Sequence, residues 1–349
     1  MNGPAAHAEA RRQRVVLVGS PVVDVVVRPV QAELEKRGVE ASYLEETAFR
    51  ENGRKVLRDA DILYCPGALP VSSHDLADAP FLRAIVSVYT GTDGIDEEAA
   101  TARNILIANG QVPENTESMA EAAILLMLAA SYDLSGAERA MTPGGAALPR
   151  RAPRLLRGKT VGLIGFGEIG RAVAARLEPW GVTLLISTPR PRAPFPPGAA
   201  FVSLEELLAR ADVTCLTAPL RPETENLLSR ERLAGTKPGS LFVNISRGQL
   251  VDEQALFDLA KSGHFSAIAL DVFATEPLPE ESPLRTLPNA ILTPHALGHT
   301  VDSKDGIIRA GVENICRALS GERPLYVRNQ AILPRWQAQW AGSPRTEPS

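Results

Sequence analysis

Three glycines within Thr160–Leu177 form a pattern that can bind a dinucleotide. Gly165, Gly167 and Gly170 make a GxGxxG motif between an apolar run and an amphipathic one. The first glycine permits a tight turn, the second lets the backbone approach a pyrophosphate, and the third lets helix and strand pack closely. The helix amino terminus then offers free N–H groups to the phosphates. In this context the motif predicts a dinucleotide-binding unit, and a purely structural turn is the alternative.

The residues after the next predicted strand indicate which dinucleotide is bound. An acidic residue at that strand end would accept hydrogen bonds from the ribose 2′-hydroxyl of NAD. Here the run from Ser187 is STPRPR, which holds Arg190 and Arg192 and no acid. Because arginines can pair with a 2′-phosphate, we expect NADP as the preferred cofactor, with NAD possible. The alternative is that these arginines only solubilise a proline-rich loop.

Three later stretches each hold a polar residue suited to acid–base or carboxylate chemistry. They are NISRGQLVDEQAL (Asn244–Leu256), ALDVFATEPLP (Ala269–Pro279) and LTPHALGHT (Leu292–Thr300). Taken singly, an arginine, glutamate or histidine is more often a surface or capping residue. Together, in this order after a dinucleotide fingerprint, the stretches resemble the D-isomer-specific 2-hydroxyacid dehydrogenase family. VYTGTDGID (Val88–Asp96) and NTESMAEAAILLML (Asn115–Leu128) extend this resemblance over nearly the whole chain.

The resemblance implies catalytic roles for three residues. Arg247 matches the family's substrate-binding arginine, whose planar guanidinium can hold a carboxylate at two points and polarise the keto oxygen. His295 matches the proton donor and acceptor, a role that suits imidazole near neutral pH. Glu276 matches the carboxylate paired with that histidine, and an anion there favours the imidazolium form and fixes its orientation. Hydride would pass between NADPH and C2 while His295 moves the proton.

The resemblance also implies a wider set of binding residues. The substrate would contact Arg247, His295 and backbone N–H groups near Thr90 and Gly91. Asp271 would orient the nicotinamide carboxamide, although an Asp at a strand end is also a common turn residue. The residues expected to line the cofactor site are Gly165, Gly167, Glu168, Ile169, Gly170, Thr188, Arg190, Arg192, Thr217, Pro219, Ile245 and Asp271. No metal site is expected.

Short apolar runs that alternate with amphipathic stretches must position these residues. Strands are predicted at 15–18, 62–64, 85–89, 160–164, 183–187, 213–217, 241–245 and 267–270, and helices at 30–37, 119–140 and 170–180. Continuous apolar strands separated by helices indicate parallel sheets covered on both faces, the α/β class. The residues from Ala331 onward are expected to form a frayed tail, with a lid or subunit contact as the alternative.

The family resemblance implies two flavodoxin-like or Rossmann-like domains with doubly wound parallel sheets and the active site in the interdomain cleft. We expect a substrate-binding (catalytic) domain of residues 1–114 and 297–349, and a dinucleotide-binding domain of residues 115–296. The length of 349 residues agrees with about two domains. The resemblance also implies a homodimer.

Composition and charge exclude several classes of protein. Hydrophobic residues make up 44% of the chain and charged residues 22%, values typical of a globular protein. The net charge of −4 argues against a nucleic-acid-binding surface. Three scattered cysteines indicate reduced thiols, not a disulfide framework. No apolar run reaches the roughly 20 residues of a membrane span. We therefore expect a cytoplasmic protein with a small-molecule substrate and no nucleic-acid or membrane partner.

A few positions depart from the family pattern without touching the three catalytic residues. Ala123 and Thr217 stand where many members have histidine, and Glu168 stands where many have arginine. We expect an NADP(H)-preferring reductase of 2-keto acids, similar to glyoxylate and hydroxypyruvate reductases. One alternative is a phosphite dehydrogenase-like enzyme, which shares the arginine, glutamate and histidine. Another is a dinucleotide-sensing protein like the C-terminal-binding corepressors. Glu276 argues against a formate dehydrogenase, because that branch of the family resembles this chain but has a glutamine at the matching position.

Overall fold

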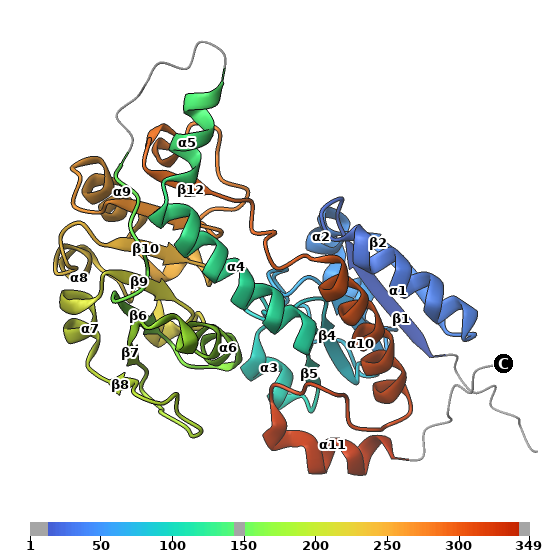
Figure 1. The fold of residues 1–349 in the computed structure, drawn as a ribbon. Helices are drawn as coiled ribbons and strands as arrows, with labels where there is room; N and C mark the ends of the chain where they lie inside the picture. The colour runs from blue at the N-terminus through green and yellow to red at the C-terminus, as the bar shows by residue number, and fades with distance from the viewer. Residues whose placement is uncertain (1–12, 143–150, 342–349) are drawn as a thin grey trace, which may run out of the picture. The chain divides into compact units, whose positions relative to one another are not determined.

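The computed structural model describes residues 13–142 and 151–341, which form two compact units (Figure 1). Unit 1 comprises residues 1–113 and 301–349, and unit 2 comprises residues 114–300. Each unit contains one wholly parallel sheet with helices on both faces, which confirms the predicted fold class. The boundaries predicted from sequence are 114/115 and 296/297, and the functions assigned to the two domains remain predictions.

Unit 1 has the strand order β2-β1-β3-β4-β5, which is that of flavodoxin-like folds. Its elements are β1 (Arg14–Gly19), α1 (Asp24–Lys36), β2 (Glu40–Glu45), α2 (Glu46–Leu57), β3 (Ile62–Cys65), β4 (Ala84–Ser87), α3 (Glu97–Ala102), β5 (Leu106–Ala108), α10 (Val301–Leu319) and α11 (Leu333–Trp340). Because alternate side chains of a strand point to opposite faces, β1 places Val15 and Leu17 in one core and Val16 and Val18 in the other. Helices α1, α10 and α11 cover the first core, and α2 and α3 cover the second.

The C-terminal segment belongs to the core of unit 1, so the prediction of a frayed tail from Ala331 is wrong for the described residues. The chain forms η5 (Gln330–Ile332) and then α11. Trp336 on α11 is fully buried, and its indole N–H donates to the carbonyl of Arg83 at 2.8 Å. The sequence of α11, LPRWQAQW, has few apolar residues besides its tryptophans, so its burial depends on distant partners that no local pattern reveals.

Unit 2 has the strand order β12-β11-β10-β9-β6-β7-β8. Strands β6, β7 and β8 correspond to strands 1, 2 and 3 of a Rossmann fold, whose spatial order is 3-2-1-4-5-6. Its strands are β6 (Thr160–Ile164), β7 (Thr183–Ser187), β8 (Ala200–Phe201), β9 (Val213–Leu216), β10 (Leu241–Asn244), β11 (Ala267–Leu270) and β12 (Ala290–Leu292). Its helices are α4 (Pro113–Ser131), α5 (Leu134–Met141), α6 (Glu168–Leu177), α7 (Leu204–Arg210), α8 (Arg230–Ala234) and α9 (Glu253–Lys261). Helices α4 and α6 cover one face, and α7, α8 and α9 cover the other.

The helix predicted at 119–140 is two helices, which corrects that expectation. Helices α4 and α5 meet at a bend of 61°. Asp133 lies at the break with a left-handed backbone (φ 53°). Its buried carboxylate accepts hydrogen bonds from the backbone N–H of Arg151 at 3.1 Å and from the Arg151 guanidinium at 2.9 Å. This distant partner holds Asp133 out of helical geometry. The segment 142–158 is rich in proline, glycine and arginine and is predicted from sequence to be a loop; residues 143–150 of it lie outside the described residues.

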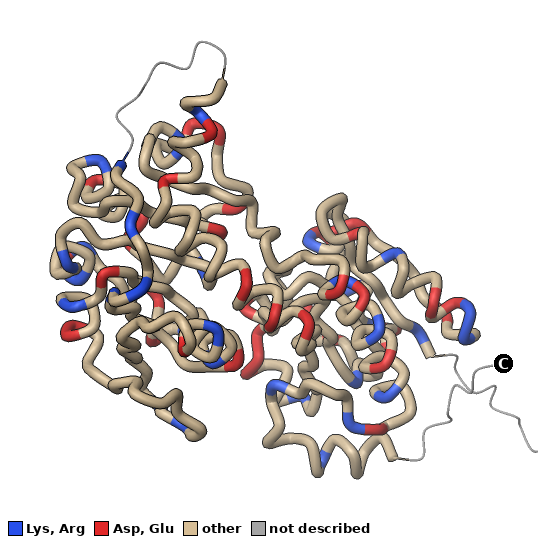
Figure 2. Tube along the Cα trace, in the orientation of Figure 1, with Lys and Arg blue, Asp and Glu red and all other residues tan. Residues whose placement is uncertain are grey.

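Acidic and basic residues are interspersed along both units (Figure 2). Within residues 13–142 and 151–341, no single helix has the length and apolar character to cross a membrane. The bent pair α4 and α5 meets that criterion only by length and composition.

Candidate active site

Most of the candidate residues of unit 2 lie in the turns after its parallel strands. The fingerprint glycines follow β6, Thr217 and Pro219 follow β9, and Ile245 and Arg247 follow β10. Asp271 and Glu276 follow β11, and His295 follows β12. Carboxyl ends of parallel strands share one edge of a sheet, and β6 and β9 are neighbours at the point where the strand order reverses. Ligands of open α/β sheets bind at that point.

The glycine turn after β6 has the shape that a dinucleotide requires. Gly165 has a left-handed backbone (φ 98°), and a Cβ there would lie 2.6 Å from the backbone nitrogen of Ala218. A Cβ at Gly170 would lie 2.9 Å from the Gly165 carbonyl oxygen. At Gly167 a Cβ would meet nothing within 4 Å, so another group can approach this backbone. The Thr217 hydroxyl donates to the Gly165 carbonyl at 3.0 Å and holds the turn against β9.

The loop that follows β7 presents the two arginines expected to select the cofactor. Arg190 and Arg192 are exposed, and Thr188 before them is partly buried. Neither arginine side chain forms an ion pair with any residue in the ranges 13–142 and 151–341. Glu168 is also exposed, at the first position of α6, and Ile169 is partly buried.

His295 and Glu276 form a direct pair. The His295 Nδ1 and the Glu276 Oε2 lie 2.7 Å apart, and the Glu276 Oε1 accepts a hydrogen bond from the Phe273 N–H at 3.0 Å. His295 has a left-handed backbone (φ 52°), a conformation that non-glycine residues adopt infrequently and that occurs at functional sites. Burial opposes ionisation of Glu276, but His295, the Phe273 N–H and Arg247 outweigh it and hold its pKa below the usual value.

Arg247 is held beside this pair by the turn that follows β10. The buried Asn244 side chain donates to the Arg247 carbonyl at 3.0 Å and accepts from the Ser246 N–H at 3.0 Å. Gly248 begins the short helix η3 (Gly248–Leu250), and a Cβ there would overlap the backbone of Phe273 and Ala274. The turn after β10 therefore packs directly against the turn that leads to Glu276.

Asp271 has both a structural contact and an unsatisfied atom. Its Oδ1 accepts hydrogen bonds from the Thr293 hydroxyl at 2.6 Å and from the Ala296 N–H at 3.3 Å. Its Oδ2 is buried and has no hydrogen-bond partner among the described residues. A buried carboxylate oxygen is costly to leave unpaired, so this atom fits the amide donor of a nicotinamide carboxamide. The glycine turn and this oxygen together fit a nicotinamide dinucleotide.

In unit 1, buried side chains fix the loop at Thr90 and Gly91. The Asn109 side chain donates to the Thr90 carbonyl at 2.7 Å, and the Ser87 hydroxyl donates to the Gly91 carbonyl at 2.7 Å. A Cβ at Gly67 would overlap the Gly91 carbonyl. Each peptide N–H points away from the carbonyl of the same peptide, so these contacts also fix the directions of the next N–H groups. The substrate role of this loop remains a prediction.

The residues that hold the candidate side chains in place were not predicted from the sequence. They are Ser87, Asn109, Asn244, Gly248 and Thr293. Only their places in the sequence could have indicated this role: Ser87 and Asn244 are the last residues of strands, and Gly248 directly follows Arg247. No group of three or more His, Cys, Asp or Glu residues in the described ranges could hold a metal ion.

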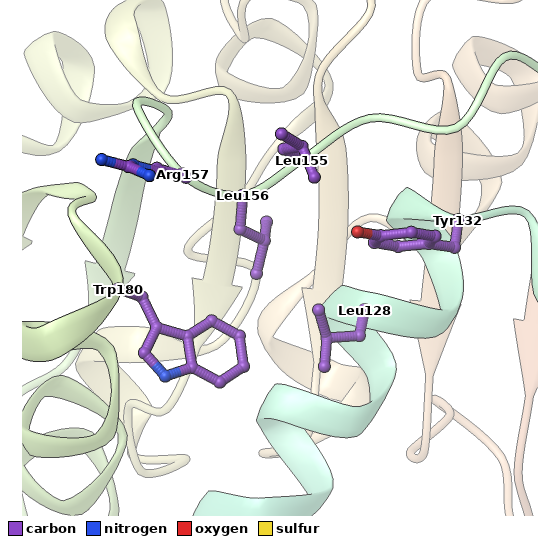
Figure 3. Close-up of a pocket in the computed structure, with 6 residues that line it drawn as sticks. All are labelled: Leu128, Tyr132, Leu155, Leu156, Arg157 and Trp180. Atoms are coloured by element: carbon purple, nitrogen blue, oxygen red, sulfur yellow. The ribbon is translucent and has the colours of Figure 1, made fainter.

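A small apolar pocket on unit 2 involves none of these residues (Figure 3). Leu128 and Tyr132 line it from the region of α4, Leu155 and Leu156 from the segment before β6, and Trp180 from η1 (Glu178–Trp180). Its volume is about 240 Å³. The segment with Leu155 and Leu156 leads into the amino end of β6, whereas the candidate residues follow carboxyl ends.

Comparison with known proteins places this arrangement in a family. The model of the family described as "D-isomer specific 2-hydroxyacid dehydrogenase, NAD binding domain" matches residues 124–296. The D-3-phosphoglycerate dehydrogenase of Mycobacterium leprae is 37% identical over 88% of this chain, and the match spans 57% of that relative's length. The glyoxylate reductase of Korarchaeum cryptofilum is 32% identical over 79% of this chain and 85% of that protein.

A solved structure agrees with these matches. The NADPH-dependent glyoxylate/hydroxypyruvate reductase of Sinorhizobium meliloti, in complex with NADP and malonate, aligns with a TM-score of 0.81 and 28% identity. The alignment covers 93% of this chain and 98% of that chain. The predicted family is therefore confirmed by sequence and by fold. The chain belongs to the D-isomer-specific 2-hydroxyacid dehydrogenase family.

Proposed function

We propose that the protein is an NAD(P)-dependent oxidoreductase that interconverts a 2-keto acid and a D-2-hydroxy acid. The observation that supports this most directly is the His295–Glu276 pair at 2.7 Å, beside Arg247 and on the same sheet edge as the dinucleotide turn. Such a pair is suited to moving one proton at a substrate oxygen. Arg247, Glu276 and His295 are the proposed catalytic residues.

Each of the three residues has a distinct part in the reaction. Because the His295 Nδ1 faces Glu276, its Nε2 is the nitrogen left to protonate the keto oxygen or to accept the hydroxyl proton. Glu276 accepts a hydrogen bond from the His295 Nδ1 and fixes the orientation of the ring. The Arg247 guanidinium holds the substrate carboxylate and polarises the keto oxygen. A bound nicotinamide dinucleotide would donate or accept the hydride.

We propose NADP as the preferred cofactor. Arg190 and Arg192 are exposed in the loop after β7, at the position where a ribose-binding acid would otherwise stand. A 2′-phosphate would give these side chains a charged partner, and charge-assisted hydrogen bonds are stronger than neutral ones. The Sinorhizobium meliloti relative, which is NADPH-dependent by name, supports this assignment.

We propose a substrate of the glyoxylate or hydroxypyruvate type. The match to the glyoxylate reductase of Korarchaeum cryptofilum, at 32% identity over 85% of that protein's length, supports this substrate class. A second candidate is D-3-phosphoglycerate, because the Mycobacterium leprae dehydrogenase that acts on it by name is 37% identical. This chain spans 57% of that relative's length.

We also propose that the protein is a cytoplasmic homodimer, with the apolar pocket of unit 2 covered by the second copy. Leu155 is 62% exposed, Tyr132 45% and Trp180 36%. A cluster of exposed apolar side chains is typical of a surface that another chain covers, and two-fold dimers are the commonest oligomers. Sedimentation of Leu155→Asp should give a monomer where the unaltered protein gives a dimer. A monomeric unaltered protein would contradict the proposal.

Absorbance at 340 nm tests the reaction and the cofactor together. Purified protein is supplied with NADPH or NADH and with glyoxylate, hydroxypyruvate or 3-phosphohydroxypyruvate, and phosphite with the oxidised cofactors is run in parallel. We expect fastest loss of absorbance with NADPH and one of the first two acids. Oxidation of phosphite alone would favour the phosphite dehydrogenase reading. No reaction with a wide panel of keto acids or with phosphite would contradict the proposed enzyme and favour a dinucleotide-sensing protein.

A further inference from the structure

The loop from Thr188 to Gly198 is held by contacts that the sequence motifs do not include. Five of its residues are prolines, which restrict the backbone before any ligand binds. The loop has no hydrogen-bonded strand or helix of its own. The conformation of the loop therefore depends on contacts with side chains of other elements.

Arg171 on α6 makes the polar contacts to this loop. Its Nη1 donates to the Pro194 carbonyl at 2.6 Å, and its Nη2 donates to the Arg192 carbonyl. The two acceptors are two residues apart, so one planar guanidinium spans the segment directly after Arg190. Arg171 is the residue that follows Gly170, the last glycine of the fingerprint.

A row of aromatic rings makes the second set of contacts. Phe195 in the loop packs edge-on against Phe201 on β8, with ring centroids 4.7 Å apart. Phe201 packs against Phe166 in the glycine turn, with centroids 5.8 Å apart. The Arg171 guanidinium lies over the Phe166 ring, 4.6 Å from its centroid. The glycine turn and the arginine loop are thus joined both by Arg171 and by the aromatic row.

We propose that Arg171 is a positioning residue for cofactor selection: it holds Arg190 and Arg192 in place for a 2′-phosphate, at a fixed position relative to the glycine turn. This inference rests on the proposed function, because it assumes that the loop contacts the cofactor. Arg190 and Arg192 carry like charges, so holding them close together has an electrostatic cost in the absence of an anion. A rigid loop that is fixed in advance reduces the ordering cost of binding.

Trypsin digestion without cofactor tests whether Arg171 holds the loop. Arg190 precedes a proline and resists trypsin, whereas the Arg192–Ala193 bond is open to cleavage and its carbonyl accepts from Arg171. Because native-state proteolysis reports the population of the open form, Arg171→Gln should speed cleavage at this bond by about 10-fold or more. The fragment that begins at Ala193 identifies the cut by mass. Arg171→Lys keeps the charge but not the fork, so it should behave like the glutamine variant.

Steady-state kinetics test whether the held loop selects the cofactor. In Arg171→Gln and Arg171→Lys the KM for NADPH should rise by about 10-fold, while the KM for NADH and both kcat values change by less than about 3-fold. The matched control is Arg176→Lys, on the same helix, because Arg176 contacts Glu117, Glu121 and Ala172 and not the loop. It should leave both the cleavage at Arg192 and the KM for NADPH unchanged.

Three outcomes would overturn the inference. The first is cleavage at Arg192 at the unaltered rate in both Arg171 variants. The second is faster cleavage with an unchanged KM for NADPH, which would make the contact purely structural. The third is full rescue by Arg171→Lys, which would assign the effect to charge alone. If the unaltered enzyme does not prefer NADPH, the proposed cofactor fails separately, because the cleavage assay needs no cofactor and still reports on Arg171.

Discussion

Two regions of unit 2 differ in how they are held: the turns after β10, β11 and β12, which carry the proposed catalytic residues and are called the catalytic turns below, and the loop after β7 that carries Arg190 and Arg192, called the arginine loop. The catalytic turns contact one another through backbone and buried polar groups, as where Gly248 meets Phe273 or where Asn244 holds Arg247. The arginine loop is exposed and rich in proline, and side chains from other elements hold it. Proton transfer requires reacting groups within hydrogen-bond distance, so its geometry is built into neighbouring strands. In the proposed function, by contrast, cofactor choice depends on an exposed loop whose residues can be substituted without disturbing the sheet.

Replacing the histidine of the catalytic turns should give the largest effect. His295→Asn removes the proton donor, and asparagine accepts the left-handed backbone at this position. We expect kcat to fall by about 10²–10⁴-fold, the usual contribution of general acid–base catalysis. The measurement is the 340 nm assay together with a thermal melt. The exposed His74 supplies the control, His74→Asn, which should leave kcat unchanged. A kcat for His295→Asn within about 3-fold of the unaltered value would assign proton transfer to another group.

Removing both arginines of the loop should affect one cofactor only. A hydrogen bond to a charged group contributes about 1.5–3 kcal/mol, so Arg190→Ala with Arg192→Ala should raise the KM for NADPH by about 10–100-fold. The KM for NADH should change little, because NADH has no 2′-phosphate. The control is Arg58→Ala, an exposed arginine of unit 1. Equal increases for both cofactors would contradict the assignment of these residues to the 2′-phosphate.

Disturbing the contact between the turns tests whether the catalytic region is as rigid as its packing indicates. Gly248→Ala places a Cβ on the backbone of Phe273 and Ala274. Overpacking of this kind costs about 1–3 kcal/mol of unfolding free energy, measured by urea denaturation. We also expect lower kcat/KM, since Arg247 and Glu276 move apart. In the control, Gly235→Ala, a Cβ makes no contact closer than 3.4 Å. Unchanged stability and activity in Gly248→Ala would show that the two turns can move apart to accommodate the added methyl group.

The pH dependence of stability should show the smallest effect. The pKa of Glu276 is lowered in the folded state, so the folded protein favours the ionised carboxylate. This contribution is present above the usual glutamate pKa of about 4.3 and is lost as the pH falls through the lowered folded value. Unfolding free energies from pH 7 to pH 3 should therefore fall less steeply in Glu276→Gln than in the unaltered protein. Identical slopes would mean that the pair with His295 adds no pH-dependent stability.

The strands and motifs of this protein could be predicted because their signals are local. Each strand expected from an apolar run is present, and the motifs mark the turns after β6, β10, β11 and β12. Strands β2, β5, β8 and β12 were missed. β2 (EASYLE) alternates exposed and partly buried residues at a sheet edge, and β8 has only two residues, so neither has a continuous apolar run.

The contacts that hold the site could not be predicted because they join residues far apart in the chain. Arg171 reads as an ordinary helix arginine, and only the folded structure brings it to the carbonyls of Arg192 and Pro194. The break between α4 and α5 follows from a partner of Asp133 that lies 18 residues away. The expectation of one long helix failed for this reason, since the apolar pattern continues across the break.

Because α10 and α11 follow unit 2 in the chain, unit 1 can be completed only after unit 2 has been synthesised. Unit 2 consists of one continuous segment, 114–300, and all of it is synthesised before α10 and Trp336 exist. Domains generally fold as units during synthesis, so unit 2 can reach its native state while the sheet of unit 1 still lacks part of its cover. Strand β1 is thus synthesised before unit 2 but fully covered only after it. Nascent chains should leave the face of β1 that carries Val15 and Leu17 partly exposed until α10 and α11 have been synthesised.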